Sequence, residues 1–133
     1  MTRLIAPLAA AALLLSAPFA SAEGDVAKGE KIFRKCAACH TITADGPKKP
    51  GPNLHNIVGR KVGSLEGFAY SDAMKAGGEA GDTWTDAHLK EFLADPKALY
   101  KGHKMTFPGL KKEAEQNDVV AYLRANSPDA PAE

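Results

Sequence analysis

The sequence predicts a single all-α domain built from helices and long loops. In several segments apolar residues recur at three- and four-residue steps, the period of a helix that buries one face. Runs of alternating apolar residues, which would indicate strands, are scarce. The segment 41–67 is rich in Gly, Pro, Lys and Asn and is predicted to be a loop. A loop of that length is unusual in a compact domain unless it surrounds something.

The first helix is predicted to begin after Asp25, whose side chain is suited to an N-cap. Its apolar face consists of Val26, Gly29, Ile32, Phe33 and Cys36. These positions fall on one side of a helix. We therefore expect this helix to bury that side against the rest of the domain.

Three further helices follow. A short one begins near Ser71, within residues 69–75. The next begins at Thr85 and ends near Ala94, because the residue before a proline (here Pro96) is disfavoured in helices. The last helix is predicted over residues 112–125. The apolar faces of these last two helices contain Leu89, Phe92, Leu93, Val119, Val120, Tyr122 and Leu123.

The N-terminal segment has the layout of a secretory signal peptide. Residues 1–3 carry a positive charge, residues 4–15 are apolar, and 20–22 read Ala-Ser-Ala, a small-residue cleavage signature. We expect cleavage after Ala22. An uncleaved membrane anchor is the alternative, although Pro7 interrupts the apolar run and the run is shorter than the roughly 20 residues that span a bilayer.

Removal of the first 22 of the 133 residues leaves 111, which is enough for one domain over 23–133. Residues 127–133 contain two prolines and two acidic residues, and we expect them to be a frayed tail. Of the 17 basic residues only Arg3 lies in the leader, so the remainder balances the 16 acidic residues. This balance gives no indication of nucleic-acid binding.

The pentapeptide Cys-Ala-Ala-Cys-His, at 36–40, carries the most specific chemistry. C-x-x-C-H is the attachment motif of a c-type haem: the two thiols bind the porphyrin, and the histidine can ligate the iron. A redox dithiol or half of a zinc site are the alternatives. The chain has only two cysteines, and no βαβ pattern surrounds them. The sequence thus predicts helices and long loops wrapped around one covalent haem c, bound through Cys36 and Cys39.

A second iron ligand would come from further along the chain. Met74 lies in the predicted short helix, where packing is the simpler role, whereas Met105 lies in a Gly/Pro loop with no helical period. Beside a haem motif, Met105 is the obvious thioether ligand. His103 is the rival ligand, and His55 and His88 are interpreted as surface or loop residues.

The chain resembles the class I cytochromes c, including small soluble bacterial cytochromes c and c2 and the mitochondrial protein. The resemblance covers essentially all of the sequence after the leader. Its motifs occur in family order, at 24–29, 36–40, 51–54, 59–60, 68–73, 83–84, 95–97, 104–109 and 121–123. No single short motif carries this match, which makes it specific.

The resemblance implies a role for each matching residue. His40 and Met105 match the axial iron ligands, and the Pro52 carbonyl would accept a hydrogen bond from the other nitrogen of the His40 ring. The remaining matches near the haem are Arg60, Tyr70 and Trp84, which would hold or neutralise the propionates, and Phe107, beside the exposed haem edge. The matches at the contact between the terminal helices are Gly29, Phe33 and Tyr122.

The chain also departs from the family. Phe92 stands where a tyrosine near the methionine sulfur is frequent, and His103 stands where a threonine usually contacts a propionate. Met74 takes the place of an expected asparagine, and residues 77–81 look like a small insertion before Trp84.

With His and Met both on the iron, the resemblance implies electron transfer rather than catalysis. The expected protein is a soluble, monomeric periplasmic carrier between a quinol-oxidising cytochrome bc complex and a terminal oxidase or photosynthetic reaction centre. The lysines that match the family's docking positions are Lys35, Lys97, Lys104, Lys111 and Lys112. The alternatives are a dedicated electron acceptor of a periplasmic dehydrogenase, and a haem enzyme or gas sensor.

Overall fold

The structure is a computed structural model that describes residues 24–132, so the predicted leader and its cleavage site lie outside the described residues. The helices of this part are α1 (Val26–Phe33), α2 (Asp72–Glu79), α3 (Asp86–Ala94), α4 (Pro96–Leu99) and α5 (Glu113–Ala125). Over the same residues the only pairing of extended backbone is an isolated bridge between Lys61 and Thr83. The predicted all-α fold class is confirmed. Within 24–132 no helix has the length and apolar character needed to cross a membrane.

Side-chain caps set the starts of three helices, as expected from the sequence. Asp25 accepts a hydrogen bond from the Lys28 amide at 3.0 Å. Ser71 and Thr85 likewise accept from the amides of Met74 and His88, at 3.3 and 3.1 Å. Each bond satisfies an amide of the first turn that has no partner within the helix. The predicted helix starts are therefore confirmed.

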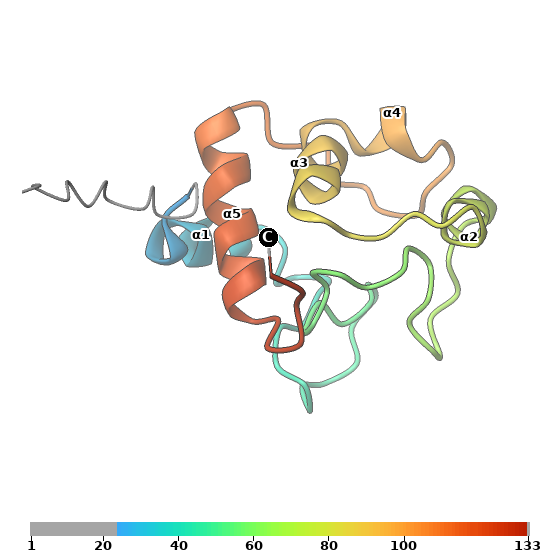
Figure 1. Ribbon diagram of the computed structural model, residues 1–133, viewed down its shortest axis with the longest axis horizontal. Coiled ribbons are helices and arrows are strands. Elements are labelled where there is room, and N and C mark those ends of the chain that lie inside the picture. Colours follow the sequence, from blue (N-terminus) through green and yellow to red (C-terminus); the bar gives the residue numbers. More distant parts are fainter. Residues whose placement is uncertain (1–23, 133) are drawn as a thin grey trace, which may run out of the picture.

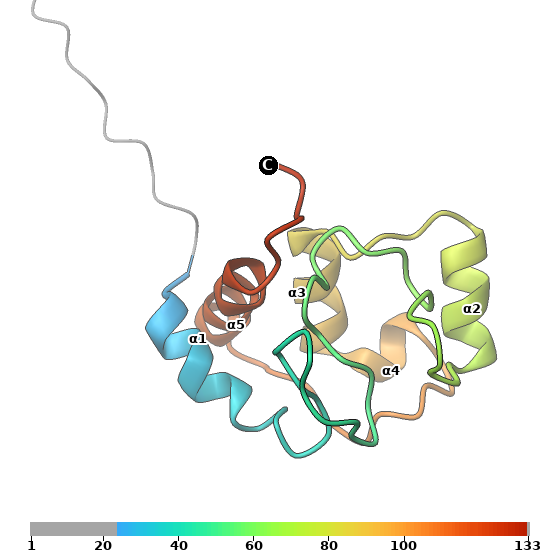
Figure 2. The same cartoon turned by 90° about the horizontal axis from the view of Figure 1, so that it is seen from below.

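The terminal helices α1 and α5 lie side by side (Figures 1 and 2). A Cβ atom at Gly29 would overlap the backbone carbonyl of Asp118, so only glycine permits this approach. The Phe33 and Tyr122 rings pack beside it with centroids 5.3 Å apart. The Asp25 amide also donates to the Asp118 carboxylate at 2.8 Å. This contact fixes α1, and with it the start of the segment that follows α1.

Helix α3 completes the core against α5. The Arg124 guanidinium forms a two-armed ion pair with Asp86, with Nη2 and Nε each 2.9 Å from a carboxylate oxygen. The buried apolar residues are Phe33, Ile57, Val58, Val62, Trp84, Leu89, Phe92, Tyr100, Leu110, Val119, Val120 and Leu123. They come from loops as well as from helices, because most of the chain between α1 and α2 is loop.

Two features differ from the expectation. Helix α2 spans Asp72–Glu79 instead of the predicted 69–75, so Gly77 and Gly78 of the suggested insertion are helical. Position 78 requires glycine in this helix, because a Cβ there would overlap the Val62 carbonyl oxygen. The one-turn helix α4 was not expected. It begins at Pro96, which suits a first turn, and Asp95 accepts from the Ala98 amide at 3.3 Å.

The expectation of a frayed tail is wrong for its described part, 127–132. The buried Ser127 hydroxyl accepts from the Val58 amide at 3.2 Å and donates to the Leu123 carbonyl at 2.8 Å. Asn56 and Asp129 exchange two hydrogen bonds of 3.1 Å each. Val58 and Asn56 lie about 70 residues before the tail residues that they bond, so the composition of the tail gave no sign of these contacts.

Candidate functional site

The two cysteines lie on a tight turn that directly follows α1. The amides of Cys36 and His40 donate to the carbonyls of Phe33 and Cys36, at 2.7 and 2.9 Å, so the turn continues the winding of the helix. Neither thiol is in a disulfide, and Cys36 packs against the core while Cys39 is exposed. Burial raises the pKa of the Cys36 thiol, and neighbouring Lys35 opposes this.

The His40 ring is held in one orientation. Its Nδ1 lies 2.7 Å from the Pro52 carbonyl oxygen, so Nδ1 donates and Nε2 keeps its lone pair. Burial lowers the pKa of His40, against the effect of the Pro52 hydrogen bond. A neutral imidazole with a free Nε2 is the form that binds metal. This orientation, next to two thiols, fits the attachment of a haem.

Two neighbours close around this ring. The Gly51 amide donates to the Cys39 carbonyl at 2.7 Å, and a Cβ at Gly51 would lie only 2.6 Å from His40 Cε1. Lys49 Nζ donates to the Ala37 carbonyl at 2.6 Å, within the pentapeptide. Sequence reasoning missed Lys49, which carries no motif of its own. Together these contacts bind the loop that carries Pro52 to the Cys36–His40 turn.

Met105 lies in the connection between α4 and α5, whereas His40 closes the turn after α1 and directly precedes the 41–67 loop. The two predicted ligands thus come from well-separated parts of the chain. Met105 is partly buried against the core, and so is Met74, on α2. Ligation by Met105 stays a prediction.

His103 is oriented by the backbone of Met105. The Met105 amide donates to His103 Nδ1 at 3.1 Å, so the ring proton is on Nε2. Nε2 is buried and has no partner among the described residues. An unpaired buried donor is costly unless an acceptor is bound there. A carboxylate of a bound haem would be a suitable acceptor for this N–H. A protonated Nε2 has no lone pair with which to bind iron.

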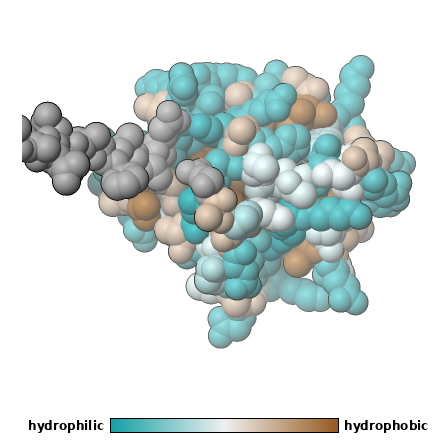
Figure 3. Space-filling view, in the orientation of Figure 1, coloured by the Kyte–Doolittle hydropathy of each residue, from teal (hydrophilic) through white to brown (hydrophobic). Residues whose placement is uncertain are grey.

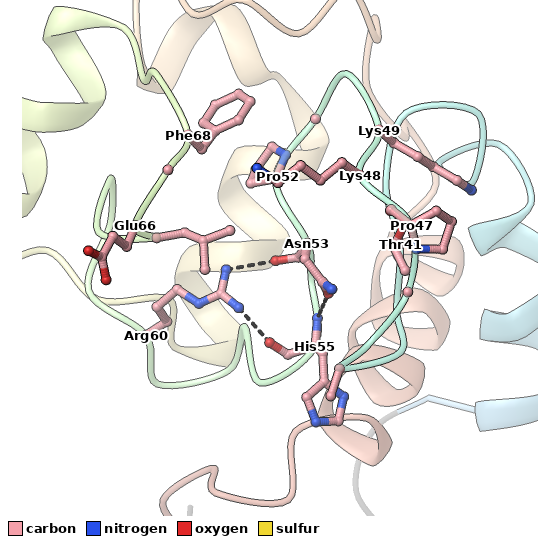
Figure 4. Close-up of a pocket in the computed structure, with 15 residues that line it drawn as sticks. Thr41, Pro47, Lys48, Lys49, Pro52, Asn53, His55, Arg60, Glu66 and Phe68 are labelled. Atoms are coloured by element: carbon pink, nitrogen blue, oxygen red, sulfur yellow. Dashed lines mark hydrogen bonds between the residues drawn. The ribbon is translucent and has the colours of Figure 1, made fainter.

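Of the three residues expected near the propionates, only Arg60 lines a cleft of the described structure. Arg60 donates to the carbonyls of Asn53 and His55 at 2.9 and 2.5 Å, as Figure 4 shows. Tyr70 accepts from the Leu65 amide at 3.3 Å, and Trp84 is buried. Burial lowers the pKa of Arg60 and raises that of Tyr70.

A cleft of about 360 Å³ lies beside Arg60 (Figure 4). Pro52 and Phe68 line it, together with Lys48, Lys49 and Glu66. Phe107, the fourth residue that the resemblance places near the haem, is partly buried against the core. The roles of these residues toward a haem remain predictions.

The five predicted docking lysines are all exposed. Two of them also make hydrogen bonds: Lys104 Nζ donates to the Ala69 carbonyl at 2.8 Å, and Lys111 Nζ to the Ala94 carbonyl at 2.9 Å. The face drawn in Figure 3 is mostly hydrophilic, with only scattered apolar residues. A partner that binds the face drawn in Figure 3 would therefore meet hydrophilic residues first.

The reading of His55 and His88 as surface or loop residues is incomplete. Both are half-buried: His55 Nδ1 lies 3.1 Å from the Ile42 carbonyl, and His88 Nε2 lies 2.7 Å from the Tyr100 hydroxyl. Sequence reasoning also missed Tyr100 itself. No local pattern signals such a contact, because its partners come from separate elements.

Comparison with known proteins identifies close relatives. The profile of the family described as Cytochrome c matches residues 26–127. The chain is 48% identical over 104 residues to cytochrome c of Gibberella zeae, which covers 77% of this chain and 95% of that protein. Cytochrome c2 of Agrobacterium tumefaciens is 42% identical over 111 residues, covering 84% and 100%. The solved structure of cytochrome c2 from Rhodospirillum centenum superimposes with a TM-score of 0.74 at 41% identity, covering 79% and 100%.

Proposed function

The chain belongs to the cytochrome c family, and on that basis we propose that it is a one-electron carrier with one haem c, attached through Cys36 and Cys39 and ligated by His40 and Met105. The observation that carries this proposal is the 2.7 Å contact between His40 Nδ1 and the Pro52 carbonyl. It frees Nε2 for iron on the same turn as two unpaired thiols. When bound, the haem supplies an iron that accepts or releases one electron.

The protein's own groups prepare the site for that task. The Pro52 carbonyl holds the His40 proton on Nδ1 and makes the ring a better donor to a metal. Buried apolar residues such as Trp84 and Phe92 exclude water and lower the local polarity. Met/His ligation and burial both favour reduced iron and so raise the potential. With His40 and Met105 both bound, the iron would have no position left for a substrate, which argues against catalysis.

Arg60, Tyr70 and Trp84 each carry a hydrogen-bond donor suited to the haem carboxylates. We assign this role to Arg60, Tyr70 and Trp84, as the family resemblance implies, with Phe107 beside the exposed edge. Arg60 is already half-buried and oriented by two backbone carbonyls. A half-buried cation stabilises a nearby carboxylate more than a fully solvated cation does, because water screens their attraction less.

The carrier is proposed to work in the periplasm. The leader-like residues 1–22 support export, and relatives include the cytochromes c2 of Agrobacterium tumefaciens and Blastochloris viridis. We propose a soluble monomer that carries electrons from a cytochrome bc complex to a terminal oxidase or photosynthetic reaction centre. The docking surface is formed by Lys35, Lys97, Lys104, Lys111 and Lys112.

The decisive experiment is expression of the full chain with a c-type haem maturation system, followed by fractionation. The periplasmic fraction should contain a protein that begins at Glu23 and carries one haem that survives denaturation. Its spectrum should be that of a six-coordinate, low-spin haem with a positive reduction potential. Rapid binding of carbon monoxide by the reduced protein would instead favour the haem enzyme or gas sensor, and a protein without covalent haem would refute the proposal.

A further inference from the structure

Tyr100 lies at the C-terminal end of α4, five residues before Met105, and is only 5% exposed. Its hydroxyl is held from two sides. It donates to Asp82 Oδ2 at 2.7 Å, and His88 Nε2 lies 2.7 Å away on the other side. A tyrosine hydroxyl has one proton, so the bond with His88 must be donated by His88 Nε2–H. The three groups therefore form a chain of hydrogen bonds in which His88 donates to Tyr100 and Tyr100 donates to Asp82.

This arrangement joins three separate parts of the chain. Asp82 precedes the Lys61–Thr83 bridge and Trp84, His88 belongs to the first turns of α3, and Tyr100 begins the connection to Met105. The rings pack together as well, with the Tyr100 centroid 6.0 Å from the centroids of both Trp84 and Phe92. Burial, and then the bond to Asp82, raise the pKa of Tyr100, which keeps its proton in place.

Helix α2 packs against Tyr100 and Asp82 through Gly77. A Cβ atom at Gly77 would lie 2.7 Å from Tyr100 Cε1 and 2.8 Å from Asp82 Oδ2. Only glycine lets the helix backbone approach the pair so closely. The extension of α2 through Gly77 and Gly78, which the sequence presented as an insertion, thus packs directly on the Tyr100–Asp82 bond.

Tyr100 is connected to Met105 by short steps of backbone. The Tyr100 carbonyl accepts from the His103 amide at 3.3 Å, and His103 Nδ1 accepts from the Met105 amide at 3.1 Å. Between them Gly102 has φ +77°, a left-handed conformation that favours glycine. No helix or strand includes residues 101–105. The segment is held by these bonds to Tyr100 at one end and by the bond of Lys104 Nζ to the Ala69 carbonyl.

We propose that the Tyr100 hydroxyl, bound between Asp82 and His88, is a positioning group for the Met105 segment and keeps the Met105 side chain in place for iron. The expected effect on the sulfur-to-iron band rests on the proposed function, in which Met105 is an iron ligand. Its structural consequence, the restraint of residues 100–105, stands independently of ligation.

The test is Tyr100→Phe in the complete haem protein, which removes one oxygen and leaves the ring. Tyr122→Phe is the matched control, since that ring packs on Phe33 in the contact of α1 with α5. Amide hydrogen exchange is measured at His103 and Met105, and at Leu123 in α5. The temperature at which the oxidised protein loses its near-infrared sulfur-to-iron band is measured in parallel.

In Tyr100→Phe we expect exchange at His103 and Met105 to be roughly 10- to 100-fold faster, as for loss of a buried hydrogen bond to a charged group. Leu123 should be unchanged, and the band should disappear at a lower temperature than in the wild type. Tyr122→Phe should change neither the two loop amides nor the band. Adding Asp82→Ala to Tyr100→Phe should increase exchange no further, since each change removes one partner of the same bond.

Equal acceleration at Leu123 and at the loop amides would overturn the proposal, because it would show a general loss of stability. Unchanged exchange at His103 and Met105 would overturn it too, as would additive effects of the two substitutions. A wild-type protein without the near-infrared band would refute Met105 ligation, not the restraint, which the exchange measurement decides separately.

Discussion

His40 Nδ1 lies 2.7 Å from the carbonyl oxygen of Pro52, across a loop of 12 residues. This one bond selects the ring tautomer, points Nε2 away from the loop, and ties the haem-attachment turn to the segment 41–67. The close packing of Gly51 on the same ring leaves His40 little freedom to rotate. The first prediction follows from this crowding.

Gly51→Ala should displace the His40 ring. The added methyl would lie 2.6 Å from Cε1 and 2.8 Å from Nδ1, so either the ring or the loop must move. Overpacking of this kind costs about 1–3 kcal/mol of stability. We expect less covalent haem per protein and a higher reduction potential, because a weaker Pro52 bond makes the His40 ring a poorer donor and so stabilises oxidised iron less. Thr43→Ser, on the same loop but exposed and outside the cleft, is the control and should leave both values unchanged.

Met105→Ala should abolish the near-infrared sulfur-to-iron band of the oxidised protein and lower the reduction potential. Met74→Ala should keep the band and only reduce stability, by up to about 2 kcal/mol for a partly buried side chain. Optical spectra and potentiometric titration of the two variants decide between the two methionines. Loss of the band in Met74→Ala alone would show that the assignment is wrong.

The chain without haem should fail to fold. Replacing Cys36 and Cys39 together by alanine removes both attachment points, and the 41–67 loop has few apolar residues with which to form a core alone. We expect the exported double variant to lack a cooperative thermal transition by near-ultraviolet circular dichroism. A sharp, native-like melt of this variant would contradict the prediction.

The C-terminal tail should stabilise the fold through Ser127. Ser127→Ala would leave the buried Val58 amide without its acceptor, which costs about 1–3 kcal/mol. Asp129→Ala removes the exposed bond that Asn56 Nδ2 donates to the carboxylate, keeps the bond of the Asp129 backbone amide to Asn56, and should cost less than about 1 kcal/mol. Urea denaturation of the two variants measures both costs. Equal and negligible costs would indicate that the tail is not held in solution.

Stability should fall in alkali partly because of Tyr100. Its pKa is raised in the folded protein above the ordinary value of 10.0, first by burial and then by Asp82. The folded state keeps a proton that the unfolded state releases, so this contribution is complete below pH 10 and is lost as pH rises above it. Tyr100→Phe should therefore show a shallower decline between pH 10 and 11.5, by at most about 1.4 kcal/mol per pH unit. Parallel declines in denaturation experiments would argue against the shift.

The sequence by itself determined the features whose interactions are local. Asp25, Ser71 and Thr85 cap the helices predicted from them, because each side chain bonds an amide only three residues later. The Cys36–His40 turn is equally local, since its backbone bonds span three or four residues. The fold class followed from the helical periods, and the family from motifs spread along the whole chain after the leader.

Only the tertiary structure decided how distant segments meet. Tyr100 bonds to Asp82 and His88, which are 18 and 12 residues away, and no spacing rule connects them. The tail was misjudged for the same reason, because Ser127 and Asp129 meet Val58 and Asn56 across the fold. Gly77 was seen from the sequence only as part of a small insertion, and its close approach to Tyr100 is a feature of the tertiary structure. Local sequence sets backbone preferences within a few residues, whereas the pairing of remote polar groups depends on packing that the whole chain creates.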